Sequence, residues 1–408
     1  MTAREYPVFT VTPKAERSLR AGHPWVYGEE VTAVEGAYQN GDIVDVVSNK
    51  GRYLGTGWVN DHSKIRVRII SRNANDTFDE AFFRRRVCYA LNYRKTVMGP
   101  VDYRCCRLIF GEADQFPGLT VDRFENILVT QVLSLGMERR KDWVYRALVE
   151  LLREDGEQID AIYERNDVAI RTLEGLEQGK GFYQMEGLRT DLSGHVTITE
   201  NGIKYDVDYI EGQKTGFFLD QKYNRQAAAK LARGRRGLDC FTHTGAFALN
   251  AAAAGAEHVT AVDVSAFALE LAAENGKRNG LTNLDYKCAD VFDLLTEMAK
   301  EKKCDYDYII LDPPAFTKSR ATAKNAYHGY KEINRKAMRL LPRGGYLATC
   351  SCSHFMTDEM FRKMLQEAAL DAGVTLRQIE ARQQAPDHPI LPEVPETDYL
   401  KFYLLQVV

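Results

Sequence analysis

The stretch Leu238-Asp-Cys-Phe-Thr-His-Thr-Gly-Ala-Phe-Ala-Leu249 runs from a short apolar segment through a glycine turn into a helix-forming segment. Three further apolar runs also end on an acidic residue, at 259–263, 284–290 and 308–312. Helix-forming segments, such as 266–279, fill the intervals. Strands that alternate with helices at this spacing predict an α/β fold with a parallel, doubly wound sheet.

The acidic residues at the ends of these runs point to a ligand site. In a doubly wound sheet, ligands bind beyond the carboxyl ends of the strands. The first turn lacks the G-x-G-x-x-G pattern that cradles a pyrophosphate, which disfavours a dinucleotide, and Asp263, about twenty residues further on, is placed to bind a ribose diol. These features fit S-adenosylmethionine. Any single Asp is equally well explained as a helix cap, so the prediction depends on four of them in register.

Three motifs in the second half of the chain carry a resemblance to a known family. They are Asp312-Pro-Pro-Ala-Phe316, Asp239-x-Phe-x-x-x-Gly245 and Thr215-Gly-Phe-Phe-Leu-Asp-Gln-Lys-Tyr-Asn-Arg225. Together they resemble class I S-adenosylmethionine-dependent RNA methyltransferases, and more narrowly the ribosomal RNA large-subunit methyltransferase I type, which makes 5-methylcytosine. The resemblance covers the whole chain, because Gly22-His-Pro-Trp-Val26 and Ile65–Ile70 are similar to that family's PUA domain, a small RNA-binding barrel.

The resemblance implies three domains. We place a PUA-like β-barrel at residues 1–73, a central α+β domain at 74–187 and a Rossmann-like class I methyltransferase domain at 188–408. A glycine-rich stretch at 175–187 is the predicted linker, and Asn201-Gly202 predicts a tight hairpin turn after it.

The resemblance also implies where the cofactor binds. In that family the segment matching residues 215–225 lies beside the cofactor, and the turns at the strand ends supply the other contacts. The predicted cofactor-binding residues are Asp220, Gln221, Asn224, Arg225, Asp239, Phe241, Thr244, Gly245, Asp263, Ser265, Asp290, Val291 and Asp312.

Ser351-Cys352-Ser353 matches the family's Ser-Cys-Ser motif, in which the cysteine is the nucleophile. Carbon 5 of cytosine does not take a methyl group unaided, whereas thiolate addition at carbon 6 makes it enamine-like. We therefore predict that Cys352 and Asp312 are catalytic, with Asp312 bonded to the cytosine edge. Cys350 is expected in the core; from the residues alone, a buried structural role for both cysteines competes with this interpretation. Ala315 stands where some related enzymes carry a second cysteine, so no base is assigned for the carbon-5 proton.

Local charge differs from total charge in this chain. The total of 54 Lys and Arg against 57 Asp and Glu does not suggest a nucleic-acid binder. However, residues 62–107 and 313–343 each carry a net charge of +7, and residues 108–185 carry −6. Basic residues with interleaved tyrosines suit RNA, although such a run also forms solvated helix faces. The predicted substrate contacts are Pro313, Pro314, Phe316, Lys318, Tyr330 and Lys331.

Other features narrow the class of protein. The N-terminal residues carry no apolar run, no segment is long enough to span a membrane, and the eight cysteines show no C-x-x-C spacing. We expect a cytoplasmic enzyme that acts on ribosomal RNA without membrane or metal, and the sequence leaves a homodimer open. The first alternative is an N-methyltransferase acting on a guanine of ribosomal RNA, which needs no thiol. The second is an RNA-binding assembly factor without catalysis. The third is a small-molecule or protein methyltransferase, against which the PUA-like barrel argues.

Overall fold

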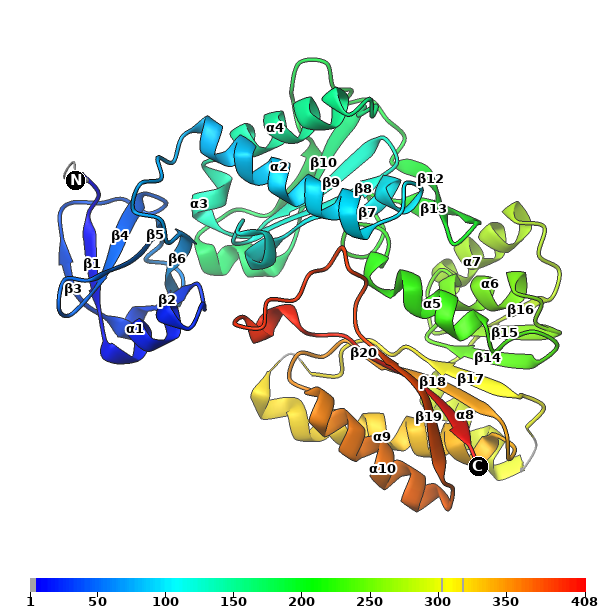
Figure 1. Cartoon of the computed structure of the whole chain (residues 1–408). Helices are drawn as coiled ribbons and strands as arrows, with labels where there is room; N and C mark the ends of the chain where they lie inside the picture. Colours follow the sequence, from blue (N-terminus) through cyan, green and yellow to red (C-terminus); the bar gives the residue numbers. More distant parts are fainter. Residues whose placement is uncertain (1–4, 302–303, 318) are drawn as a thin grey trace. The chain divides into compact units, whose positions relative to one another are not determined.

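The structure is a computed structural model that describes residues 5–301, 304–317 and 319–408 (Figure 1). The chain groups into two compact units, which are described separately. Each unit combines segments that are far apart in the sequence. Unit 1 consists of Met1–Ile198, Val207–Leu219 and Pro386–Thr397, and unit 2 of Thr199–Asp206, Asp220–Ala385 and Asp398–Val408.

Unit 1 begins with a six-stranded sheet in the order β2-β6-β5-β4-β1-β3. β1 and β4 are parallel and the other neighbours are antiparallel. Helix α1 (Pro13–Arg20) starts at the N-cap Thr12 and adds Ala15 and Leu19 to the core of this sheet. The strands are β1 (Val8–Val11), β2 (Trp25–Tyr27), β3 (Val31–Glu35), β4 (Ile43–Ser48), β5 (Tyr53–Val59) and β6 (Ile65–Ser71).

A second, five-stranded sheet of unit 1 has the order β11-β10-β9-β8-β7. Its helices are α2 (Glu80–Val97), α3 (Leu135–Glu138) and α4 (Lys141–Glu154), and α2 packs against α4. Asp79 caps α2 by accepting a hydrogen bond from the Phe82 amide. The strands are β7 (Cys105–Phe110), β8 (Leu119–Phe124), β9 (Ile127–Val132), β10 (Ala161–Asn166) and β11 (Gly179–Phe182).

The predicted linker at 175–187 is wrong in its central part. Residues Gly179–Phe182 form β11, which pairs antiparallel with β10 at the edge of the sheet. Glycine has no side chain to pack but keeps its backbone donor and acceptor, and an edge strand needs little more. Composition alone therefore misidentified an edge strand as a linker.

Unit 2 is built on a seven-stranded sheet in the order β16-β15-β14-β17-β18-β20-β19. The first five strands are mutually parallel, which confirms the predicted doubly wound α/β sheet, and β20 is antiparallel to both β18 and β19. The strands are β14 (Arg236–Cys240), β15 (His258–Asp263), β16 (Leu284–Cys288), β17 (Tyr308–Leu311), β18 (Tyr346–Ser351), β19 (Leu376–Arg382) and β20 (Lys401–Val407).

Successive strand residues point to opposite sides of the sheet, so both faces carry apolar side chains. Helices cover both faces and bury these side chains. Ile309 lies in the core formed with α8, α9 and α10, whereas its neighbour Ile310 lies in the core formed with α5 and α6. Helix α7 packs against β15 and β16. The helices are α5 (Lys222–Ala229), α6 (Ala246–Ala253), α7 (Ala266–Arg278), α8 (Val291–Glu301), α9 (Ala323–Leu340) and α10 (Asp358–Ala372).

The predicted hairpin is present as β12 (His195–Glu200) and β13 (Ile203–Asp208). Its turn residues Asn201 and Gly202 both have positive φ, 54° and 79°, as a tight two-residue turn requires. No helix in the described part of the chain is long and apolar enough to cross a membrane.

Candidate active site

The turn between β14 and α6 is conformationally unusual. Phe241 and His243 have φ values of 63° and 52°, which non-glycine residues rarely adopt, and Gly245 at 83° begins α6. A Cβ at Gly245 would lie 2.6 Å from Leu249 Cδ1 and 2.9 Å from Ala272 Cβ, so only glycine fits without a shift. Strain of this kind persists only where surrounding contacts hold it in place.

Asp239 stabilises this turn through two hydrogen bonds. Its fully buried Oδ2 accepts hydrogen bonds from Thr242 Oγ1 at 2.5 Å and from the Ala248 amide at 2.9 Å. Burial raises the pKa of Asp239 to about 7. Its other oxygen, Oδ1, is buried and has no hydrogen-bond partner among the described residues, which leaves an acceptor for a donor from a ligand.

Asp263 joins two turns at the ends of β14 and β15. It accepts hydrogen bonds from the amides of His243 and Ser265, both at 2.9 Å. Ser265 in turn caps α7 through the Ala268 amide. The next acidic residue, Asp290, is exposed and caps α8 through the amides of Phe292 and Asp293, while Val291 is buried. Ser265 and Asp290 therefore cap their own helices, whereas Asp263 links its turn to the turn after β14.

Asp312, directly after β17, has a different kind of environment. Its Oδ1 accepts a hydrogen bond from Gln221 Nε2 at 3.0 Å, and the buried thiol of Cys350 lowers the pKa of Asp312. Burial and the negative charge of Asp220 raise the pKa of Asp312 to about 6. The carboxylate thus interacts with side chains from distant parts of the sequence.

The segment 220–225 makes three sets of buried side-chain contacts. Asn224 donates to Gln221 Oε1 at 2.7 Å, and Gln221 bonds to Asp312 as described above. Asp220 accepts a hydrogen bond from the hydroxyl of Tyr399 at 2.6 Å. Arg225 forms a buried ion pair with Glu200 at 2.5 Å, which joins α5 to the end of β12.

Cys350, on β18, and Cys352, just after this strand, differ in exposure. β18 lies next to β17, as expected, and Cys350 is fully buried in the core on the α5 and α6 side. Cys352, one residue beyond the strand, is half-buried with its Sγ 4.0 Å from the carbonyl oxygen of Pro313. The more accessible thiol thus lies beside the segment that follows Asp312.

Comparison with known proteins identifies the family. A profile described as an S-adenosylmethionine-dependent methyltransferase matches residues 183–405, and one described as a PUA-like domain matches residues 9–72. The chain belongs to the S-adenosylmethionine-dependent methyltransferase family. It is 40% identical to a ribosomal RNA large subunit methyltransferase I of Pseudoalteromonas atlantica, over 98% of this chain and 99% of that protein. It is 42% identical to the protein of the same name from Shewanella denitrificans, over 97% and 98%.

Solved structures share the methyltransferase fold. A protein from Streptococcus mutans, assigned as a SAM-dependent methyltransferase, is 22% identical with a TM-score of 0.81, and covers 98% of this chain and 100% of its own. A second structure, assigned as a methyltransferase and solved with SAH, has the same identity and coverage and a TM-score of 0.82.

The residues at the strand ends fit the methyltransferase cofactor, S-adenosylmethionine, which supplies a sulfonium methyl group. The buried Oδ1 of Asp239 offers an acceptor to a cationic donor such as the ammonium of a methionine moiety. The glycine at position 245 keeps α6 close to α7, and the Phe241–Gly245 turn presents its backbone beside Asp263. Among the described residues, no group of three or more His, Cys, Asp or Glu side chains could hold a metal ion.

Lys401 is a residue of this methyltransferase that the sequence analysis missed. It lies on β20 opposite Ser351, is only 4% exposed, and its Nζ donates to the carbonyl oxygens of Ser353 and Tyr399, both at 2.7 Å. Burial lowers the pKa of Lys401 to about 8, against the opposing negative charges of Asp398, Cys352 and Asp358. The signal in the sequence was a lysine within the apolar run at 400–405.

The predicted substrate contacts are only partly accessible. Phe316 is half-buried, and its ring centroid lies 4.5 Å from that of Tyr330. Tyr330 is 0% exposed and its hydroxyl bonds to Ser353 Oγ, so the prediction that it contacts RNA directly is not supported. Lys331 pairs with Glu367 and Asp371 at 3.3 and 3.0 Å. Pro313 is buried, Pro314 is exposed, and Lys318 lies outside the described residues.

The basic segment 62–107 is largely neutralised by neighbouring carboxylates. Ion pairs within 4.0 Å engage eight of its eleven Lys and Arg side chains, so its net charge of +7 overstates the positive surface. The eight are Arg66, Arg68, Arg84, Arg85, Arg94, Lys95, Arg104 and Arg107.

Proposed function

We propose that this methyltransferase forms 5-methylcytosine in ribosomal RNA of the large subunit, through a covalent bond between Cys352 Sγ and carbon 6 of the cytosine. The relatives described above are named as ribosomal RNA large subunit methyltransferases, and their similarity to this chain extends over nearly their full length. The observation that carries the cytosine assignment is the half-buried Cys352 thiol beside Pro313, next to Asp312.

In the proposed reaction, Cys352 is the nucleophile and Asp312 holds the base. The Cys352 thiolate adds to carbon 6, and the electron density moved to carbon 5 takes the methyl group from the sulfonium. Asp312 holds the amino edge of the cytosine during the addition. A water molecule then takes the carbon-5 proton, the electron pair of that C–H bond returns to the ring, and the thiolate leaves carbon 6, which restores the enzyme.

Lys401 supports the nucleophile in this proposal. Its buried ammonium donates a hydrogen bond to the carbonyl oxygen of Ser353, the residue after Cys352. The charges of Lys401 and Cys352 attract each other when the thiol is ionised. A nearby cation lowers the free energy of a thiolate relative to the thiol. At neutral pH, Lys401 is charged and therefore favours the reactive form of Cys352.

The cofactor and domain assignments are part of the same proposal. We place S-adenosylmethionine at the turn 241–245, Asp263 and the segment 220–225, with Asp290 and Val291 as further contacts. The barrel, central and methyltransferase domains are assigned to 1–73, 74–187 and 188–408, and a ribosomal RNA substrate implies a cytoplasmic location.

The test is labelled methyl transfer to RNA from a strain that lacks this protein, followed by mass spectrometry of the nucleosides. We expect 5-methylcytosine. A methylated guanine would instead establish the N-methyltransferase alternative, and S-adenosylmethionine binding without any product would support an assembly factor.

A second measurement tests the covalent step. RNA with 5-fluorocytidine at the target has no removable proton at carbon 5, so the adduct cannot resolve. We expect a protein–RNA adduct that survives denaturing electrophoresis, with RNA linked to the peptide that contains Cys352. An adduct on any other residue would contradict the assignment of the nucleophile.

A further inference from the structure

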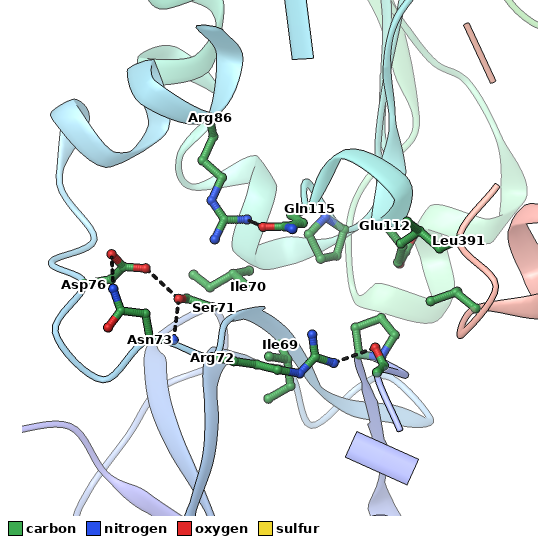
Figure 2. A pocket seen from close by; sticks show the side chains of 14 residues that line it. Ile69, Ile70, Ser71, Arg72, Asn73, Asp76, Arg86, Glu112, Gln115 and Leu391 are labelled. Atoms are coloured by element: carbon green, nitrogen blue, oxygen red, sulfur yellow. Dashed lines mark hydrogen bonds between the residues drawn. The ribbon is translucent and has the colours of Figure 1, made fainter. Parts of the chain in front are cut away.

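A cavity of about 280 Å³ in unit 1 is lined by two arginines from different elements. Figure 2 shows Arg86, from α2, on one side and Arg72, from the end of β6, on the other. Arg86 donates to Gln115 Oε1, and Arg72 donates to the carbonyl oxygen of Gly22 at 2.5 Å. Within the described residues neither guanidinium has a carboxylate within ion-pair distance, unlike eight neighbours in the same basic segment.

The carboxylates around this cavity are engaged elsewhere. Asp76 accepts hydrogen bonds from Ser71 and Asn73 and pairs with Arg85 at 3.5 Å. Glu112 accepts from Trp25 Nε1 at 3.0 Å and lies 3.8 Å from Arg68. The cavity therefore holds two partly buried cations whose natural complement is an anion supplied from outside.

Burial changes the pKa of both guanidinium groups. It lowers the pKa of Arg86 to about 10 and also lowers that of Arg72. The nearest acidic groups, Asp76 for Arg86 and the exposed Glu393 for Arg72, only partly offset this effect. Both groups remain charged at neutral pH, so an anion that enters the cavity would gain from meeting them in a partly desolvated site.

A second cavity, of about 370 Å³, shares Arg86, Gln115 and Leu391 with the first. Its wall carries Tyr89 and Tyr93, which are 62% and 37% exposed and lie one helical turn apart on α2. Gln115, between the two cavities, has a φ of 61°, an uncommon value for a residue other than glycine. The two cavities thus place cationic groups and exposed aromatic rings side by side.

We infer that these two cavities form one groove that binds single-stranded RNA, with phosphates at Arg72 and Arg86 and bases stacked on Tyr89 and Tyr93. Guanidinium groups that contact phosphates and tyrosines that stack on unpaired bases are the two components of sequence-tolerant single-strand binding. The inference rests on the proposed RNA substrate. It adds a binding site that is separate from the residues assigned to methyl transfer.

The test measures binding of a short fluorescein-labelled single-stranded RNA to the full chain by anisotropy over a range of salt concentrations, without cofactor. We expect the double variant Arg72→Gln/Arg86→Gln to bind roughly tenfold more weakly, with a salt slope lower by about 1 to 2. Tyr89→Ala should weaken binding about fivefold or more and leave the salt slope unchanged. The matched control is Arg84→Gln on the same helix, because Arg84 already pairs with Glu150 and Glu154.

Several outcomes would overturn the assignment of the groove as an RNA-binding site. Wild-type affinity and salt slope in the double variant would do so, as would an acidic peptide that binds through the two arginines while RNA binding is unchanged. Tyr89 is exposed, so its variant tests the groove even if the double variant does not fold. Ultraviolet cross-linking of RNA to the peptide with Tyr89 and Tyr93 is the expected independent result. Because binding is measured without methyl transfer, a failure of the 5-methylcytosine assignment and a failure of the groove are distinguishable.

Discussion

The two halves of the strand-end region in unit 2 are stabilised in different ways. At the ends of β15 and β16, Asp263 and Asp290 bond to backbone amides within or near their own turns. At the ends of β17 and β18, Asp312 accepts a hydrogen bond from Gln221, and Lys401 donates one to the carbonyl oxygen of Ser353. The first half is stabilised mainly by local contacts, whereas the second depends on residues that the topology brings together.

The sharpest contrast within the second half is between its two cysteines. Cys352→Ala should lower methyl transfer about 1000-fold or more, because no other group replaces the nucleophile. Cys350→Ala should leave most of the activity, because Cys350 is buried and only supports Asp312. Single-turnover methylation with both variants measures this difference. Full activity of Cys352→Ala would contradict the covalent mechanism.

Asp312→Asn should lower the single-turnover rate by about 100-fold or more, because the ionised acceptor at the cytosine edge is lost. The pKa of Asp312 is about 6, so its carboxylate is protonated as the pH falls below that value. The wild-type rate should therefore decline between pH 7 and pH 5. The residual rate of Asp312→Asn should decline less than the wild-type rate over the same pH range, because the variant has no carboxylate at this position. An identical pH profile in both proteins would remove Asp312 from the reaction.

Lys401→Met should reduce alkylation of Cys352 by iodoacetamide at pH 7 about three- to tenfold, because the thiolate loses a buried neighbouring cation. The pKa of Lys401 is about 8, so the difference from wild type should shrink as the pH rises above 8 and the lysine loses its charge. Peptide mass spectrometry separates Cys352 from the exposed Cys288. Lys401→Arg keeps the charge and should react close to the wild-type rate. If it reacts as slowly as Lys401→Met, the effect is one of packing.

The smallest effect is expected in the locally stabilised half. Asp290→Ser keeps an oxygen that can cap α8, so thermal stability should change little. S-adenosylmethionine affinity should fall about threefold to tenfold if Asp290 also contacts the cofactor, since each lost hydrogen bond is worth roughly 0.5–1.5 kcal/mol. Calorimetric titration measures the affinity. Unchanged affinity would leave Asp290 with capping alone.

This comparison also explains what the sequence could predict. The turn at Gly245 and the acidic residues at the strand ends follow from a local strand–turn–helix pattern. The sequence alone therefore identified these residues. Glu200, Tyr399 and Lys401 take their positions from strand order and from segments that return to the sheet, which local patterns do not specify. Net charge by segment was the weakest guide, because ion pairs such as Arg84 with Glu150 join segments of opposite sign.

The position of β20 between β18 and β19 also affects how this protein folds. Both β18 and β19 precede β20 in the sequence, and in the sheet β20 lies between them. Each therefore has an unsatisfied edge until the later strand inserts, and such edges are templates for intermolecular pairing. Pairing over these sequence separations is slow to form. Truncation before residue 401 would therefore leave the edge of β18 next to Cys352, and the facing edge of β19, without their partner strand.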